Sequence, residues 1–117
     1  MIIEEIVLNY LSKNLDVPVL MEVPLDVEPV ETYVVLEKTS TSEKNFICRA
    51  TFAIQSIAPT LYEAATLNLC VKKAMRDIEA LPEISTCLLN SDYNFTDTTT
   101  KTYRYQAVFD LVHYQEE

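Results

Sequence analysis

The sequence of 117 residues contains no glycine and only one histidine, His113. Average usage would supply about eight glycines in a chain of this length. Loops that cradle phosphate in P-loop and dinucleotide-binding proteins need glycine, because the backbone must approach the phosphate closely and adopt positive φ. The G-x-S-x-G turn of serine hydrolases depends on glycine as well. The composition therefore argues against common nucleotide-binding and hydrolase classes, and one histidine leaves few candidates for a multi-histidine metal site.

Positive charge is also scarce, since the chain has 18 acidic and 9 basic residues and a net charge of −9. Nucleic-acid binding depends on Lys and Arg patches that displace counterions from phosphates. We therefore expect no sequence-specific nucleic-acid binding, and anionic membrane surfaces are disfavoured for the same reason. The acidic residues concentrate toward the ends, with net charges of −6, +1 and −4 in residues 1–31, 32–82 and 83–117. This distribution predicts one strongly negative face or rim.

The three cysteines, Cys48, Cys70 and Cys87, lack the C-x-x-C spacing of zinc and redox motifs. We expect each thiol to be a small buried apolar group in a reducing compartment. No apolar run approaches the roughly 18 residues that a membrane span needs. Glu4 and Glu5 interrupt the apolar start of the chain, so we expect neither a signal peptide nor a membrane segment.

The chain does contain well-patterned amphipathic segments. Apolar residues at three- and four-residue spacing predict helices over 2–14 and 60–81. The second helix has clear ends, because Thr60 and Glu63 form a capping box and Pro82 stops it. Alternating or β-branched residues predict strands over residues 18–23, 32–38, 46–56, 84–90 and 102–114. A polar turn over 39–45 then makes an antiparallel hairpin of the second and third strands.

The element order α-β-β-β-α-β-β predicts a single α+β domain over residues 1–117. We expect an antiparallel sheet of four to five strands with two helices packed on one face. The polar, threonine-rich segment 91–101 predicts a protruding arm. Two helices leave the other sheet face exposed, where Val108, Val112 and Tyr114 predict an apolar patch typical of protein–protein contacts.

Few residues could carry catalysis or bind a metal ion. A catalytic His113 would need a cysteine nucleophile and an orienting carboxylate, which nothing in the sequence brings together, so we expect a histidine at the sheet edge. Asp92 and Asp97 could supply oxygen ligands to calcium, but the EF-hand pattern and its glycine are missing. We therefore predict a non-enzymatic protein without catalytic residues, metal or cofactor.

Aromatic residues gather in the polar C-terminal part of the chain. Within thirteen positions, and close to Lys101 and Arg104, lie Tyr93, Phe95, Tyr103 and Tyr105. Aromatic residues beside arginine are typical of interface cores, although the same rings could instead pack the core face of the sheet. Our candidate oligomer or partner interface comprises Asp92, Tyr93, Phe95, Asp97, Lys101, Tyr103, Arg104, Val108 and Val112.

Two stretches resemble known proteins. These are residues 50–65 (ATFAIQSIAPTLYEAA) and residues 90–97 (NSDYNFTD), the latter continuing through 103–110 (YRYQAVFD). They are similar to small phage and prophage proteins of Gram-positive bacteria that are encoded among head-tail joining genes, and specifically to the tail terminator, or tail completion, family. The likeness covers nearly the whole chain in element order, and its motifs are structural rather than catalytic.

The resemblance implies a ring, commonly hexameric, that binds the end of the tail tube, stops its polymerisation and provides the head-docking surface. The implied partners are further copies of the chain, the tail tube protein and a head-completion or neck protein. The implied location is the head–tail junction of the virion, after assembly in the host bacterial cytoplasm. In that family an extended loop or hairpin reaches neighbouring subunits or the tube, and residues 91–101 match it by position and composition.

Two alternatives remain open at this point. The first is a head-completion or neck connector protein, which is similar in size to a tail terminator. The second is a small-molecule-binding or enzymatic α+β domain that uses a cysteine or the Asp92 and Asp97 carboxylates.

Overall fold

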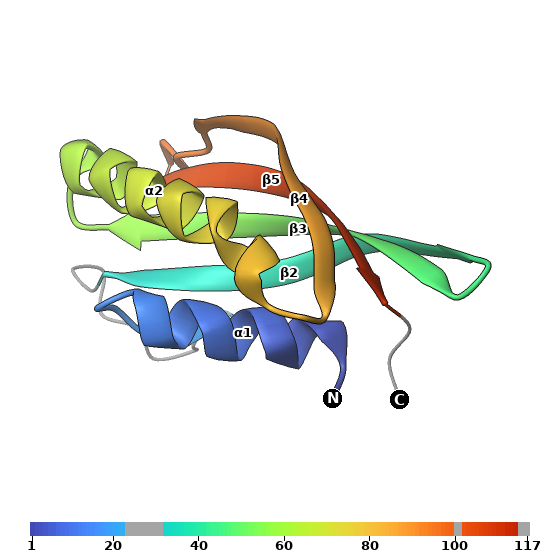
Figure 1. The fold of residues 1–117 in the computed structure, drawn as a ribbon. Helices are drawn as coiled ribbons and strands as arrows, with labels where there is room; N and C mark the ends of the chain where they lie inside the picture. The colour runs from blue at the N-terminus through green and yellow to red at the C-terminus, as the bar shows by residue number, and fades with distance from the viewer. Residues whose placement is uncertain (23–31, 100–101, 115–117) are drawn as a thin grey trace.

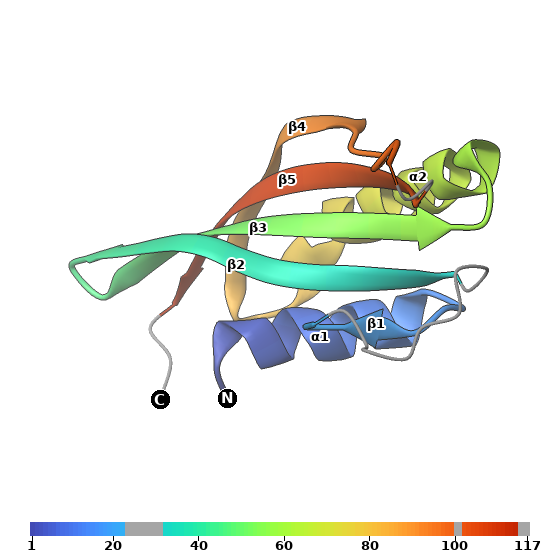
Figure 2. The same cartoon turned by 180° about the vertical axis from the view of Figure 1, so that it is seen from behind.

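The computed structural model describes residues 1–22, 32–99 and 102–114 (Figure 1). Its elements follow the predicted order: α1 (Ile3–Asn14), β1 (Val19–Leu20), β2 (Tyr33–Lys44), β3 (Ile47–Ala58), α2 (Leu61–Arg76), a 3₁₀ turn η1 (Ile78–Ala80), β4 (Ile84–Asn94) and β5 (Tyr103–Tyr114). The five strands form one sheet in the order β1-β2-β3-β5-β4. Both helices lie on the same face of this sheet, and Figure 2 shows the opposite face without a helix. The predicted α+β class, with two helices packed on one face, is confirmed.

The sheet is mixed, whereas the sequence pattern predicted antiparallel strands throughout. β1 pairs with β2 in parallel, with Val19 opposite Val34, and the other strand pairs are antiparallel. Residues 21–32 separate β1 from β2. That length is compatible with the crossover that a parallel pair requires, whereas a short hairpin turn would have made the pair antiparallel.

The hydrophobic core lies between the helices and the sheet. Alternate residues of the central strands point toward the helices, so that Phe52 and Ile54 are fully buried under α1 and α2. The large side chains of the two helices that are fully buried are Ile3, Val7, Leu11, Val71 and Met75. A second, small cluster on the opposite sheet face consists of Tyr33, Val35 and Ile57, with Leu20 packed against it.

Helix α2 begins where the capping box predicts, because the Thr60 hydroxyl accepts a hydrogen bond from the Glu63 amide at 3.1 Å. It ends earlier than predicted, at Arg76. The chain then continues as the 3₁₀ turn η1, and Leu81 takes an extended conformation with φ −74° and ψ 135°. The residue before a proline avoids helical angles, so Pro82 ends the helical segment, while the tighter turn η1 shortens the α-helix itself.

The β2–β3 hairpin is longer than predicted, and the prediction of a polar turn over 39–45 is wrong. Strand pairing continues to Lys44 and Ile47, which leaves a two-residue turn made of Asn45 and Phe46. The prediction failed because polar residues were taken to indicate a loop, whereas residues 39–44 are polar as members of an exposed strand. Figures 1 and 2 show this end of the hairpin extending beyond the helices. We call residues 39–49 the hairpin arm.

Candidate functional site

The predicted interface residues divide between the two faces of the sheet. On the face without helices, which we call the uncovered face, lie Tyr93, Phe95, Arg104, Val108 and Val112. Their positions follow from strand alternation, because Ala107, Phe109 and Leu111 of β5 are buried on the helix side. The two valines are half-buried on this uncovered face.

Tyr93, Phe95 and Arg104 form what we call the aromatic patch. The Arg104 guanidinium carbon lies 4.8 Å from the centre of the Phe95 ring, and its Nε donates to the Phe95 carbonyl at 2.7 Å. The Tyr93 and Phe95 rings meet edge to face with centroids 5.9 Å apart. Both rings remain 41% exposed. The patch is thus held in a defined geometry by cation–π and aromatic contacts while keeping accessible apolar surface.

Beside the aromatic patch, the uncovered face carries polar side chains that bond to one another across the strands. Gln55 Nε2 donates to Gln106 Oε1 at 3.1 Å, and Gln106 Nε2 in turn donates to the Tyr93 hydroxyl. Further along β5, the Asp110 carboxylate accepts from Thr51 Oγ1 at 2.8 Å. These bonds fix side chains across three strands. The uncovered face therefore combines bonded polar side chains with apolar ones, namely the aromatic patch, the small cluster around Tyr33, half-buried Val108 and Val112, and exposed Tyr114.

Asp92 and Tyr103 lie elsewhere. Asp92 points toward the helices, where it accepts hydrogen bonds from Asn68 Nδ2 at 3.3 Å and Lys72 Nζ at 3.4 Å. By the alternation of β5, Tyr103 shares the helix side with Ala107.

The Asp97 carboxylate accepts from the Thr99 amide at 3.0 Å, and its backbone pairs with Thr102. The Asp92 and Asp97 carboxylates therefore accept hydrogen bonds from different segments of the chain. Lys101 lies outside the described residues.

The segment predicted as an arm, residues 91–101, begins within the sheet. Ser91–Asn94 belong to β4 and pair with β5. The chain then turns through Phe95 and Asp97 back to β5. The hairpin arm of β2 and β3 is the part that extends away from the body of the molecule (Figure 1).

His113 is buried inside the sheet, whereas we predicted a histidine at the edge. Its strand β5 is inserted between β3 and β4, so His113 has Cys48 opposite it on one side and Ile84 on the other. The ring is 3% exposed and its Nδ1 lies 3.0 Å from the Tyr114 carbonyl oxygen. The last strand of the chain is an interior strand, and chain order alone does not reveal this insertion.

The cysteines are less buried than predicted. Cys70 is exposed, and Cys48 and Cys87 are half-buried. Burial raises the pKa of the Cys87 thiol to about 12, and the nearby Glu79 and Asp110 carboxylates add to the increase. Cys87 therefore stays protonated at neutral pH, the form in which a thiol is a weak nucleophile.

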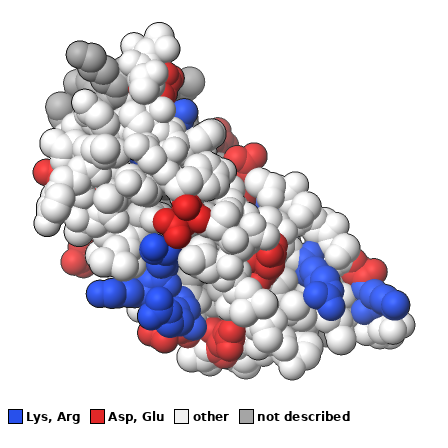
Figure 3. All heavy atoms as spheres, turned by 90° about the horizontal axis from the view of Figure 1, so that it is seen from above, with Lys and Arg blue, Asp and Glu red and all other residues white. Residues whose placement is uncertain are grey.

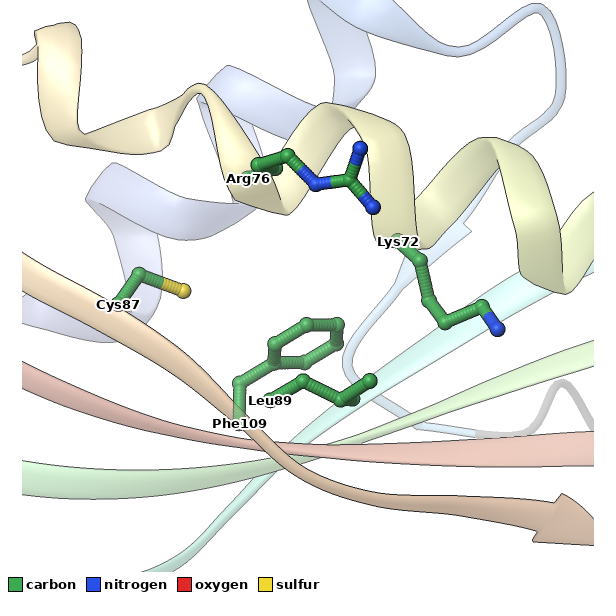
Figure 4. A pocket seen from close by; sticks show the side chains of 5 residues that line it. All are labelled: Lys72, Arg76, Cys87, Leu89 and Phe109. Carbon is green, nitrogen blue, oxygen red and sulfur yellow. The ribbon is translucent and has the colours of Figure 1, made fainter.

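A small slot lies between α2 and the sheet beside Cys87, with a volume of about 180 Å³ (Figure 4). It is lined by Lys72, Arg76, Cys87, Leu89 and Phe109. Lys72 is paired with Asp92, which offsets part of the positive charge at its rim. The slot combines an apolar floor with cationic side chains from α2.

A larger groove, of about 330 Å³, lies between the C-terminal end of α1 and the first half of α2. We call it the interhelix groove, and its lining residues are Asn14, Asp16, Val17, Tyr62, Glu63, Thr66, Leu67 and Cys70. Tyr62 is 81% exposed. The two charged residues of the lining, Asp16 and Glu63, are both acidic.

Sequence reasoning missed the end of the hairpin arm as a candidate site. Phe46 is 74% exposed and Ile47 is 46% exposed. The turn residues Asn45 and Phe46 both have positive φ, 54° and 66°. Such turns favour Asn followed by Gly, so the Asn-Phe pair between two strands was the available signal, and the absence of glycine concealed it.

Comparison with known proteins adds no relative, since no family model and no curated protein match the chain. Within the described residues, neither helix has the length and apolar character needed to cross a membrane. Across the same part of the chain, no three His, Cys, Asp or Glu side chains group closely enough to hold a metal ion.

Proposed function

We propose that this chain is a structural subunit of a phage tail, similar to a tail terminator, that assembles into a ring on the end of the tail tube. In this role the ring stops tube growth and provides the surface on which the head or neck docks. The observation that carries the proposal is the aromatic patch, because its solvent-accessible side chains are arranged for contact with another protein.

The composition of the aromatic patch supports a protein partner. Interface cores are enriched in Tyr, Phe and Arg, and residues that dominate binding energy are often Tyr and Arg. Arg104 is bonded to the Phe95 carbonyl and stacked on its ring. A surface fixed in this way loses little conformational freedom on binding.

The hairpin arm supports the same role by its shape. It extends the molecule along its longest axis, and the overall dimensions are 44 × 24 × 22 Å. Two strands that project past their own core bury little within the subunit, and in a ring such an element contacts a neighbour. Homo-oligomers with closed symmetry are the common form of soluble assemblies.

The test compares assembly of the wild type and of two surface variants. Phe95→Ser removes the ring from the aromatic patch, whereas Leu69→Ser removes an equally exposed apolar side chain (41% and 45% exposed) from the outer side of α2. Light scattering gives the mass in solution, and negative-stain microscopy with added tail tube protein shows whether rings sit on tube ends.

We expect rings or ring-capped tubes with the wild type and with Leu69→Ser, and loss of capping with Phe95→Ser. Equal capping by all three proteins would exclude the aromatic patch as the docking surface. A wild type that stays monomeric and leaves tubes bare would contradict the proposed function. Binding to a head or neck protein without binding to the tube would favour the connector alternative.

A further inference from the structure

We propose that the tip of the hairpin arm of one copy docks into the interhelix groove of the next copy, with Phe46 and Ile47 as the inserted side chains. This inference rests on the proposed function, because it assigns the contact through which the subunits associate. It names a second copy of this chain as the occupant of the groove.

The tip carries a feature that folding alone does not explain. Phe46 holds φ 66°, a left-handed conformation that costs a bulky residue free energy. Its ring is nevertheless 74% exposed, so the subunit recovers almost no burial from it. Backbone strain at an exposed aromatic residue is typical of a residue retained for a contact outside the subunit.

The interhelix groove matches the tip in size and chemistry. Its volume is about 330 Å³, and an apolar cavity of about 150 Å³ is enough to hold a benzene ring. It therefore has room for the Phe46 ring together with the neighbouring Ile47. Exposed Tyr62 and the half-buried apolar Val17 supply an aromatic and aliphatic lining.

The charges of the two surfaces are complementary. The end of the hairpin arm carries Lys44 and Arg49 against Glu43, and so is net positive within a chain of net charge −9. The groove is lined by the acidic Asp16 and Glu63. Figure 3 shows Lys and Arg side chains at the right-hand end of the molecule, where the hairpin arm lies in Figure 1. Opposite charges steer association and select the orientation of the partners.

The two surfaces lie at opposite ends of the molecule. In Figure 1 the hairpin arm extends to the right, whereas the end of α1 and the start of α2 lie at the left. A subunit therefore cannot fill its own groove with its own tip. Contacts between different patches on identical subunits run head to tail, and they generate a ring when the rotation between neighbours closes.

Mixing two variants tests the head-to-tail geometry. Phe46→Gly removes the inserted ring and relieves the positive φ, so its fold is retained. Tyr62→Ser alters the groove at an exposed position. We expect each variant alone to lose assembly, and an equimolar mixture to give a dimer and nothing larger, because only one productive contact exists per pair. Assembly of either variant to the wild-type mass would overturn the proposal.

Covalent trapping gives the decisive result even where association is weak. The groove already contains the exposed Cys70. Asn45→Cys places a thiol on the tip while keeping Phe46 and Ile47, and Lys44→Cys repeats the test at a position with ordinary strand geometry. Mild oxidation of concentrated protein is followed by non-reducing electrophoresis. The matched control for each variant adds Cys70→Ser.

We expect a ladder of disulfide-linked dimers, trimers and larger species that is lost with Cys70→Ser. No ladder above the wild-type background, or a ladder that survives Cys70→Ser, would overturn the docking proposal. If the wild type forms rings but the cysteine variants do not cross-link, the proposed function is retained and this contact is excluded. If the cysteine variants cross-link into a ladder but the protein never caps tubes, this contact is supported and the proposed function is contradicted.

Discussion

The two halves of the β2–β3 hairpin are built from the same pair of strands but are stabilised differently. In the inner half, Leu36 and Phe52 are fully buried beneath the helices. In the outer half, residues 39–47 are exposed, and only the strand pairing continues. The register shifts between Lys38 and Ser40, where the hairpin leaves the core. Core burial stabilises the inner half, whereas the side chains of the outer half are exposed and available for contact with a partner.

The largest effect is expected from the inner half. Phe52→Ala should lower the free energy of unfolding by about 3–5 kcal/mol, because it removes a fully buried ring and leaves a cavity. Thr41→Ala in the hairpin arm is the matched control and should change it by less than about 0.5 kcal/mol. Urea denaturation of both variants measures the difference. Similar losses would mean that the hairpin arm also contributes to the core.

An intermediate effect is expected at the start of α2, which covers the inner half. Thr60→Ala should cost about 1 kcal/mol, because the Glu63 amide loses its hydrogen-bond acceptor. Thr60→Ser retains the hydroxyl and should remain close to the wild type. Thermal unfolding followed by circular dichroism separates the two, and equal stability of all three proteins would contradict the assigned cap.

At the tip of the hairpin arm, a substitution should stabilise the subunit, in contrast to the two destabilising substitutions above. Phe46→Gly should raise the free energy of unfolding by about 0.5–1 kcal/mol, since glycine takes positive φ without steric cost. Phe46→Ala keeps a Cβ at the same φ and should bring little gain. Urea denaturation of the isolated subunits tests this pair, and a stability loss in Phe46→Gly would show that the ring contributes to the subunit's own fold.

The last effect is absent at neutral pH and appears only at alkaline pH. Because the pKa of Cys87 rises from its ordinary 9.0 to about 12 on folding, the stability contribution of the protonated thiol is complete below pH 9. It is lost as the pH rises from about 9 toward 12. Burial, followed by Asp77 and Cys87, also raises the pKa of Tyr10, so its contribution has the same sign.

Urea denaturation across this interval should show a shallower loss of stability in Cys87→Ala than in the wild type. Thr41→Ala removes no titratable group, so this variant should follow the wild type. Identical slopes in wild type and Cys87→Ala would contradict the raised pKa of Cys87.

Much of the fold could be predicted because its signals are local. The spacing of apolar residues in α2, the Thr60 cap and the alternation of β5 each follow from a few neighbouring positions, and the structure contains all three elements. The helix end at Arg76 was missed because the 3₁₀ turn η1 keeps Ile78 buried and so continues the helical pattern.

The remaining differences depend on contacts between distant segments. The insertion of β5 between β3 and β4 buries His113, and no local pattern reports that insertion. The exposed strands of the hairpin arm carry no core pattern, so their polarity was interpreted as a loop. In the candidate site, Tyr93, Phe95 and Arg104 were predicted together, whereas the interhelix groove joins residues such as Asp16 and Tyr62 that only the fold brings together.

The most direct test of the proposed assembly role is the length distribution of tail tubes polymerised with and without this chain, measured by electron microscopy. The proposed function predicts that added wild-type protein stops elongation and leaves a ring on one end of each tube, and the docking proposal adds that Phe46→Gly protein, although folded and more stable, leaves lengths unchanged. Tubes that keep growing with bare ends in the presence of the wild type would contradict it.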